Sequence, residues 1–231
     1  IYNTSSTIAN GLKIGGTVAS ATSAPTVTTT TAASITTTSS SSGGNVTADG
    51  GASVTAKGIA YGITANPTIT GTKTSDGTGT GSFPSSLSSL SVNTKYFYRA
   101  YATNTAGTGY GTESSFFTLA NTPSAPTVGN PTTNSVDVSV TSGDGNPAST
   151  EYAIYETTTG NYVQAGGTLG ASAVWQTAST WGTKTVTGLT ASTTYTFEVK
   201  ARNGDNVETA YSGTTNGTTS ADETLTFGNL Q

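Results

Sequence analysis

The sequence contains no histidine, cysteine or methionine, and charged residues make up only 9% of its 231 residues. Without histidine and cysteine it lacks the commonest general base, the commonest metal ligand and the thiol nucleophile of enzymes. Paired carboxylates, phosphate-binding loops and nucleophile–base sets do not stand out either. We therefore expect a protein that is not an enzyme and that needs no cofactor or metal.

The charge that is present is scattered and weakly acidic. Eight Lys and Arg face twelve Asp and Glu, which gives a net charge of −4 and argues against a nucleic-acid partner. No run approaches the roughly 18 apolar residues of a membrane helix, so membrane insertion is not expected. Because the chain has no Met, we expect Ile1 to be an internal or processed start, from which a signal peptide would already be gone.

Threonine, serine and 29 glycines take the place of the missing charge. Threonine favours strands because its branched side chain packs well on a pleated surface. Runs of Ala, Leu, Glu and Lys that would favour helices are absent. With no disulfide available, domains of about 100 residues must be stabilised by packing alone, which chains of that size achieve. The composition predicts an all-β fold.

The chain repeats itself. SAPTV begins at Ser23 and again at Ser124, and LSVNTKYFYRAYATN (residues 90–104) aligns with LTASTTYTFEVKARN (residues 189–203). These repeats predict two tandem domains of about 100 residues. The predicted division is an extended segment 1–23, a first domain 24–119, a second domain 120–220 and a strand-like segment 221–231.

Short apolar–polar alternations separated by turn signals predict antiparallel strands with one buried face. SVDVSV, YAIY and YTFEVKA show the pattern most clearly. In the first domain the expected strands cover residues 25–31, 33–39, 56–63, 79–87, 94–104 and 111–119. In the second domain they cover residues 127–131, 135–142, 150–157, 184–189, 194–203 and a segment around Tyr211.

Both copies resemble fibronectin type III domains. In each, a leucine stands six residues before a tyrosine, followed by an alternating strand that ends in Asn: Leu90 with Tyr96, and Leu189 with Tyr195. The resemblance implies an immunoglobulin-like antiparallel sandwich in which this tyrosine forms a corner, its hydroxyl bonding to upstream backbone. Both copies depart from the family in lacking the usual tryptophan on strand B. Segments such as TAKGIAYG and ATNTAGTGYGTE also resemble tandem domains of large secreted surface proteins of Bacteroidetes-like bacteria.

Trp175 and Trp181 lie close together in AVWQTASTWGTK. Tryptophan is highly buried on average, and the missing core tryptophan needs a replacement, so we expect packing in the core or at a sheet edge. The alternative is an exposed aromatic platform on which a glycan stacks.

Isolated charged residues carry simpler interpretations. Asp144 and Asp205 could be calcium ligands, but neither loop holds a second nearby aspartate, so both are expected in turns. Lys57, Lys95, Lys184 and Lys200 could form intramolecular amides with Asn, but solvated lysines on strand faces are expected instead. Three sequons for N-glycosylation begin at Asn3, Asn45 and Asn216, a number that chance explains in a chain this rich in Asn, Ser and Thr.

Both ends of the chain carry apolar strand patterns outside the repeats. Leaving such faces in water forfeits about 1.5–3 kcal/mol per large side chain, so we expect them to be buried. They could pair with a domain of the same chain, be pieces of neighbouring domains, or add to a sheet of the next subunit. The third alternative is favoured, and head-to-tail contacts of that kind build open filaments. The expected assembly contacts are Ile8, Leu12, Ile14, Val18, Leu225 and Phe227.

These observations favour a non-enzymatic, extracellular structural protein, secreted or on the cell surface. The expected role is a subunit of a bacterial surface filament or adhesive stalk, with itself as a partner in a homo-polymer. The alternative is a spacer or glycan-binding module of a secreted carbohydrate-active enzyme or large adhesin, with surface glycans or host proteins as partners. Fold alone does not decide between them.

Overall fold

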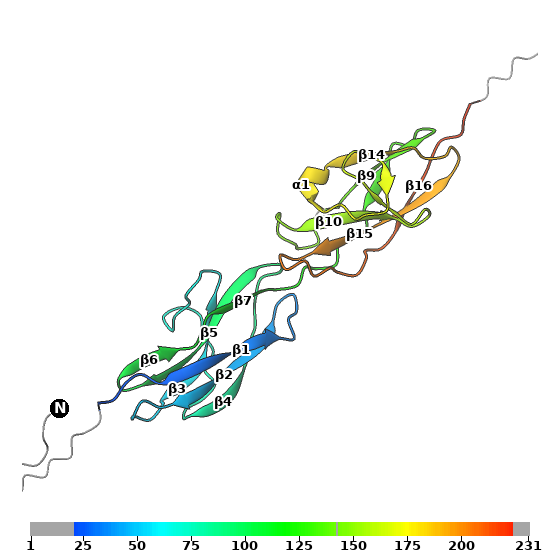
Figure 1. Ribbon diagram of the computed structural model, residues 1–231. Helices are drawn as coiled ribbons and strands as arrows, with labels where there is room; N and C mark the ends of the chain where they lie inside the picture. Colours follow the sequence, from blue (N-terminus) through cyan, green and yellow to red (C-terminus); the bar gives the residue numbers. More distant parts are fainter. Residues whose placement is uncertain (1–20, 142, 224–231) are drawn as a thin grey trace, which may run out of the picture.

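The computed structural model describes residues 21–141 and 143–223. It is an all-β molecule of two sandwiches that follow one another end to end (Figure 1). The described ends of the chain lie at opposite tips of this elongated molecule. The predicted fold class, two tandem antiparallel sandwiches, is confirmed.

The first sandwich packs two antiparallel sheets against each other. One sheet has the strand order β1-β2-β4. In the other, β3 and β6 flank the long strand β5, which also pairs with β7. The bounds are β1 (Thr26–Ala33), β2 (Ser40–Ala48), β3 (Ala56–Gly62), β4 (Gly81–Leu87), β5 (Lys95–Asn104), β6 (Gly107–Tyr110) and β7 (Ser114–Phe117).

The second sandwich repeats this plan with additions. Its smaller sheet has the order β14-β9-β8, and its larger sheet the order β12-β11-β10-β15-β16, with β13 paired to β10. A short helix, α1, precedes β14. The bounds are β8 (Thr127–Gly129), β9 (Ser135–Ser139), β10 (Glu151–Glu156), β11 (Asn161–Val163), β12 (Leu169–Gly170), β13 (Gln176–Thr177), α1 (Ala178–Trp181), β14 (Thr183–Thr187), β15 (Thr194–Arg202) and β16 (Thr215–Thr218).

Each sandwich has its own core, built from the inward residues of alternating strands. In β15 the residues from Tyr195 to Ala201 alternate between buried and half-buried, as the sequence predicts. The first core includes Ile59, Leu87 and Tyr98. The second core includes Ile154 and Phe197. The two cores are separate clusters, so each domain buries its own apolar surface.

The strand expected over residues 33–39 is wrong. Ser34 has a φ of 48°, and the hydroxyl of Thr36 accepts hydrogen bonds from the backbone N–H groups of Thr38 and Ser39. These bonds close a turn, because a threonine hydroxyl competes with the strand ladder for backbone donors. The second strand is instead β2, SSSGGNVTA, whose glycines look like a turn in the sequence.

The strand expected around Tyr211 is also misplaced. Residues 209–213 are not a strand, although the N–H of Ser212 still donates to the carbonyl of Val199 at 2.7 Å. The strand that pairs with β15 comes later, as β16.

Candidate functional site: the joint between the two domains

The residues expected in assembly contacts, Ile8, Leu12, Ile14, Val18, Leu225 and Phe227, lie outside the described residues. Asn3 of the first sequon also lies outside the described residues, whereas Asn45 lies in β2 and Asn216 in β16.

The two tyrosines singled out by the repeat occupy equivalent places. The hydroxyl of Tyr96 accepts a hydrogen bond from the N–H of Ser91 at 3.0 Å, and that of Tyr195 accepts one from the N–H of Thr190 at 2.9 Å. The preceding leucines are buried in the same cores: Leu90 and Leu189. In both domains the hydroxyl therefore binds backbone just after the buried leucine.

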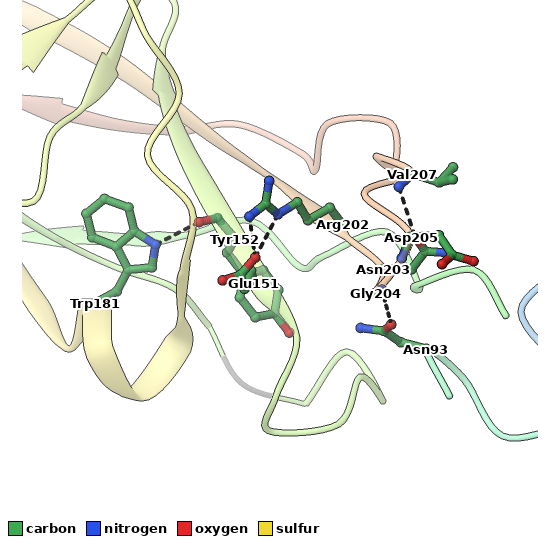
Figure 2. A network of polar contacts seen from close by, with 9 residues as sticks. All are labelled: Asn93, Glu151, Tyr152, Trp181, Arg202, Asn203, Gly204, Asp205 and Val207. Atoms are coloured by element: carbon green, nitrogen blue, oxygen red, sulfur yellow. Dashed lines mark hydrogen bonds and ion pairs between the residues drawn. The ribbon is translucent and has the colours of Figure 1, made fainter. Parts of the chain in front are cut away.

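The two tryptophans lie in different surroundings. Trp181 is 1% exposed, and its indole N–H donates to the carbonyl of Tyr152 at 2.8 Å (Figure 2). A glycan contact at Trp181 is therefore wrong, because neither face of its ring reaches solvent. Trp175 is half-buried and lies over the cations of Arg202 and Lys200, at 4.7 and 5.6 Å from its ring centroid.

The expectation of solvated lysines is wrong at two of the four positions. Lys57 is 6% exposed, and its ammonium donates to the carbonyl of Thr80 at 3.3 Å. The side chain of Lys200 is 12% exposed and is paired with Glu208. The ammonium groups of both lysines lie over aromatic rings, an arrangement that sequence spacing alone does not show.

Lys200 sits in an aromatic cluster on the outer face of the larger sheet of the second domain. Its ammonium lies 5.5 Å from the ring centroid of Tyr162 and 5.2 Å from that of Tyr211. Burial lowers the pKa of Lys200, but the Glu208 carboxylate and the Tyr162 hydroxyl outweigh burial and hold it above its usual value. Burial and the hydrogen bond with Tyr162 raise the pKa of Tyr211 to about 12.

A connected group of polar residues lies where the domains meet. The amide of Asn93 bridges to the second domain twice: its Nδ2 donates to Thr150 Oγ1 at 2.8 Å, and its Oδ1 accepts from the N–H of Gly204 at 3.1 Å. Asn93 has a φ of 41°, a conformation that Asn tolerates better than most residues. Asn93 is 9% exposed, so these bonds are largely shielded from water.

In the second domain, the loop after β15 makes the reciprocal hydrogen bonds to the first domain. Asn203 Nδ2 donates to the carbonyl of Thr118 at 3.2 Å, and Asp205 Oδ2 accepts from the N–H of Phe117 at 3.0 Å. Asn203 Oδ1 also accepts from the N–H groups of Asp205 and Val207, which closes the loop (Figure 2). Asp205 lies in the expected turn, but its carboxylate also binds the other domain.

Close packing accompanies these hydrogen bonds. A Cβ placed on Gly204 would lie 2.3 Å from the ring of Phe117, so only glycine allows this approach. We call the set Asn93, Phe117, Thr118, Thr150, Asn203, Gly204 and Asp205 the interdomain joint.

The joint was not predicted from the sequence, although the repeat contains one indication of it. Asn203 aligns with Asn104, which ends the equivalent strand of the first domain. Asn104 closes its own turn in the same way and donates to the carbonyls of Ser23 and Asp49. In both domains, a buried asparagine at the end of this strand therefore marks the tip at which the domain binds the backbone of another segment of the chain.

The chemistry at the joint is that of hydrogen bonding and packing. Arg202 and Glu151 form an ion pair beside it, at 2.6 Å. Within residues 21–141 and 143–223, no group of three His, Cys, Asp or Glu side chains is placed to hold a metal ion. In the same part of the chain, no helix is long and apolar enough to cross a membrane.

The strand pairing assigns the fold. Both domains are antiparallel β-sandwiches of two sheets, the architecture that the sequence resemblance to fibronectin type III domains implies. No protein-family model matches the chain, and no curated protein matches it.

Among solved structures, a segment of two fibronectin type III domains from chicken tenascin is similar, with 16% identity and a TM-score of 0.48. That match covers 83% of this chain and 97% of the other. The FN1–FN3 domains of chicken CNTN1 match with 17% identity and a TM-score of 0.37, over 87% of this chain and 68% of the other.

Proposed function

We propose that this chain is a non-enzymatic structural spacer of an extracellular surface protein. The observation that carries the proposal is the interdomain joint, which ties two separately folded domains together by buried side chains. Domains within a chain move relative to each other by default unless their interface prevents it. A spacer that holds its ends apart needs such an interface.

The arrangement of the joint supports a mechanical role. Its hydrogen bonds run in both directions, since Asn93 of the first domain and Asn203 of the second each donate an amide N–H across it. The described ends of the chain lie at opposite tips, so a force applied to the ends passes through both domains and the joint (Figure 1).

Small-angle scattering of the full chain tests the rigid spacer. A single elongated arrangement should fit the scattering curve, and adding salt should change the curve little because the bridging groups are mostly uncharged. A curve that requires a broad set of interdomain angles would contradict a rigid spacer.

The finer proposal is that the spacer is a filament or stalk subunit. It rests on the apolar strand patterns of residues 1–18 and 225–227, which would join subunits head to tail by strand addition. Negative-stain electron microscopy of the full chain beside a chain lacking residues 1–18 tests it. Regular fibres that vanish on truncation would support assembly through the first segment, whereas monomers in both samples would remove the filament proposal and leave the spacer.

A second candidate function is glycan binding at the outer face of the second domain. It is favoured by one observation: the half-buried rings of Trp175, Tyr162 and Tyr211 all lie within 5.6 Å of the Lys200 ammonium. Because Trp181 is buried, a glycan would change the fluorescence of Trp175 alone. Titration of the full chain and of Trp175→Ala with oligosaccharides should then give a shift only in the unmodified chain, and no shift in either would exclude this function.

A further inference from the structure

The interdomain joint contains a chemically reactive pair, Asn203 followed by Gly204. In such a pair the glycine backbone nitrogen can attack the asparagine side-chain carbonyl, because glycine has no Cβ to hinder the approach. Asparagine is among the thermally labile residues for this reason.

The joint itself requires this pair. Asn203 closes the loop after β15 with its Oδ1 and binds Thr118 with its Nδ2. Gly204 is required because any Cβ there would meet the ring of Phe117 at 2.3 Å. The residues that build the contact are therefore also the residues that can react.

The closed joint holds both reacting groups. The attacking nitrogen of Gly204 donates its hydrogen to Asn93 Oδ1 at 3.1 Å, from the opposite domain. The Asn203 amide is bound at its oxygen and at its nitrogen, and the residue is 4% exposed. Reaction requires the nitrogen to lose its proton and the side chain to rotate, and both require these bonds to open.

We propose that Asn203 is a deamidation site whose rate is set by opening of the interdomain joint. In the reaction the Gly204 nitrogen forms a bond to Asn203 Cγ, the Cγ–Nδ2 bond breaks, and ammonia leaves with the proton from Gly204. Water then opens the cyclic imide at either carbonyl, leaving a carboxylate on a normal or an isomerised backbone. The net change is one water consumed and one ammonia released.

The product weakens the joint that protected it. A carboxylate at position 203 has no N–H to donate, so the carbonyl of Thr118 loses its partner. In the isomerised form the backbone is one atom longer, which displaces Gly204 from Phe117. Deamidation therefore converts a transient opening into a permanent one.

The chain contains its own control. Asn216 and Gly217 form the same pair in β16, away from the joint. There Gly217 pairs with Tyr195 across the ladder, and Asn216 Oδ1 accepts from Thr196 Oγ1 at 2.9 Å. Its reactivity depends on the second domain staying folded, not on the joint.

The test compares deamidation rates at the two sites. The full chain, Asn93→Ala and Thr150→Val are incubated in mildly alkaline buffer, and peptide mapping by mass spectrometry follows the replacement of amide by carboxyl. Asn93→Ala removes the acceptor of the Gly204 N–H, and Thr150→Val removes the hydroxyl that positions Asn93. Each variant should raise the deamidation rate at Asn203 about fivefold to tenfold and leave the deamidation rate at Asn216 unchanged.

Equal rates at Asn203 in all three chains would overturn the proposal, as would an equal rise at both sites in both variants, because unfolding of the domain would then be the route. The deamidated chain, separated by its added negative charge, should also require a wider range of interdomain angles to fit its small-angle scattering than the unmodified chain does. An unchanged scattering curve would overturn the inferred loss of the joint.

Discussion

At the scale of single residues, the cores depend on a few aromatic side chains that carry one polar atom each. Tyr96, Tyr195 and Trp181 are all buried, and each makes one hydrogen bond to backbone. Such a residue combines a large apolar area with a fixed orientation, because a buried polar atom left without a partner is costly.

Replacing either corner tyrosine should destabilise only its own domain. Tyr96→Phe and Tyr195→Phe each leave one backbone N–H without its partner, which should cost about 1–2 kcal/mol of unfolding free energy. Calorimetry that resolves the two domain transitions measures the effect. Tyr155→Phe, at a half-buried ring on the outer face, is the control, and a comparable loss there would contradict a special role for the corners.

Trp181→Phe should destabilise the second domain by about 2–3 kcal/mol, because it removes a hydrogen bond and leaves a cavity in the core. Trp175→Phe is the matched control, with an expected change below about 1 kcal/mol at its half-buried site. Urea unfolding followed by circular dichroism compares them without depending on tryptophan fluorescence. Similar losses for both variants would argue against the core position of Trp181.

At the scale of elements, close backbone approach and local capping decide where strands lie. In β2, a Cβ on Gly43 would lie 2.2 Å from the carbonyl oxygen of Phe83 in β4. In the β10–β11 hairpin, the buried carboxylate of Glu156 accepts from the N–H groups of Thr158 and Thr159. Neither arrangement follows from strand propensity.

Gly43→Ala should disrupt the pairing of β2 with β4 and cost about 3 kcal/mol, because the clash is with backbone that cannot rotate away. Gly62→Ala is the control in the same domain, since a Cβ there meets nothing within 4 Å. Its effect should stay within about 0.5 kcal/mol. Thermal unfolding of both variants measures the difference, and equal melting temperatures would contradict the close approach.

Glu156 should make the second domain sensitive to acid. Burial raises the pKa of Glu156, but the hydroxyl and backbone donors of Thr158 and Thr159 outweigh burial and hold it below its usual value. A carboxyl with a lowered folded pKa stabilises the fold fully above its unfolded pKa, and this stabilisation is lost as pH falls through the folded pKa.

Glu156→Gln should therefore be less stable than the unmodified chain at neutral pH, by about 1–2 kcal/mol. The gap should narrow as the pH falls below roughly 4, the region where glutamate titrates. Urea midpoints measured across this range provide the test. A gap that stays constant down to strong acid would exclude the carboxylate as its cause.

At the scale of the whole molecule, the joint decides whether two domains behave as one rod. Gly204→Ala places a methyl group against the Phe117 ring and should push the domains apart while leaving both cores intact. Small-angle scattering should show a wider range of interdomain angles, with both calorimetric transitions retained. Gly213→Ala, where a Cβ meets only Ala125 Cβ at 3.8 Å, is the control and should keep the narrow range.

Much of the fold is determined by the sequence alone. Alternation in 135–139 and 194–202 predicts one buried face, and this two-residue period can be recognised in the sequence without knowing the partner strand. The repeat likewise determined two domains, because self-similarity reports repeated packing. The alternation and the repeat are local or periodic patterns, which can be recognised in a single amino-acid sequence.

Tertiary structure alone decided the rest. The glycine-rich β2 is a strand only because β4 and β1 supply its ladder partners, and Lys57 is buried only because neighbouring elements cover its stem. The joint joins Asn93 to Gly204, two residues far apart in sequence, through bonds that no spacing predicts. Contacts between distant segments depend on how folded surfaces meet, and that geometry exists only once both domains have formed.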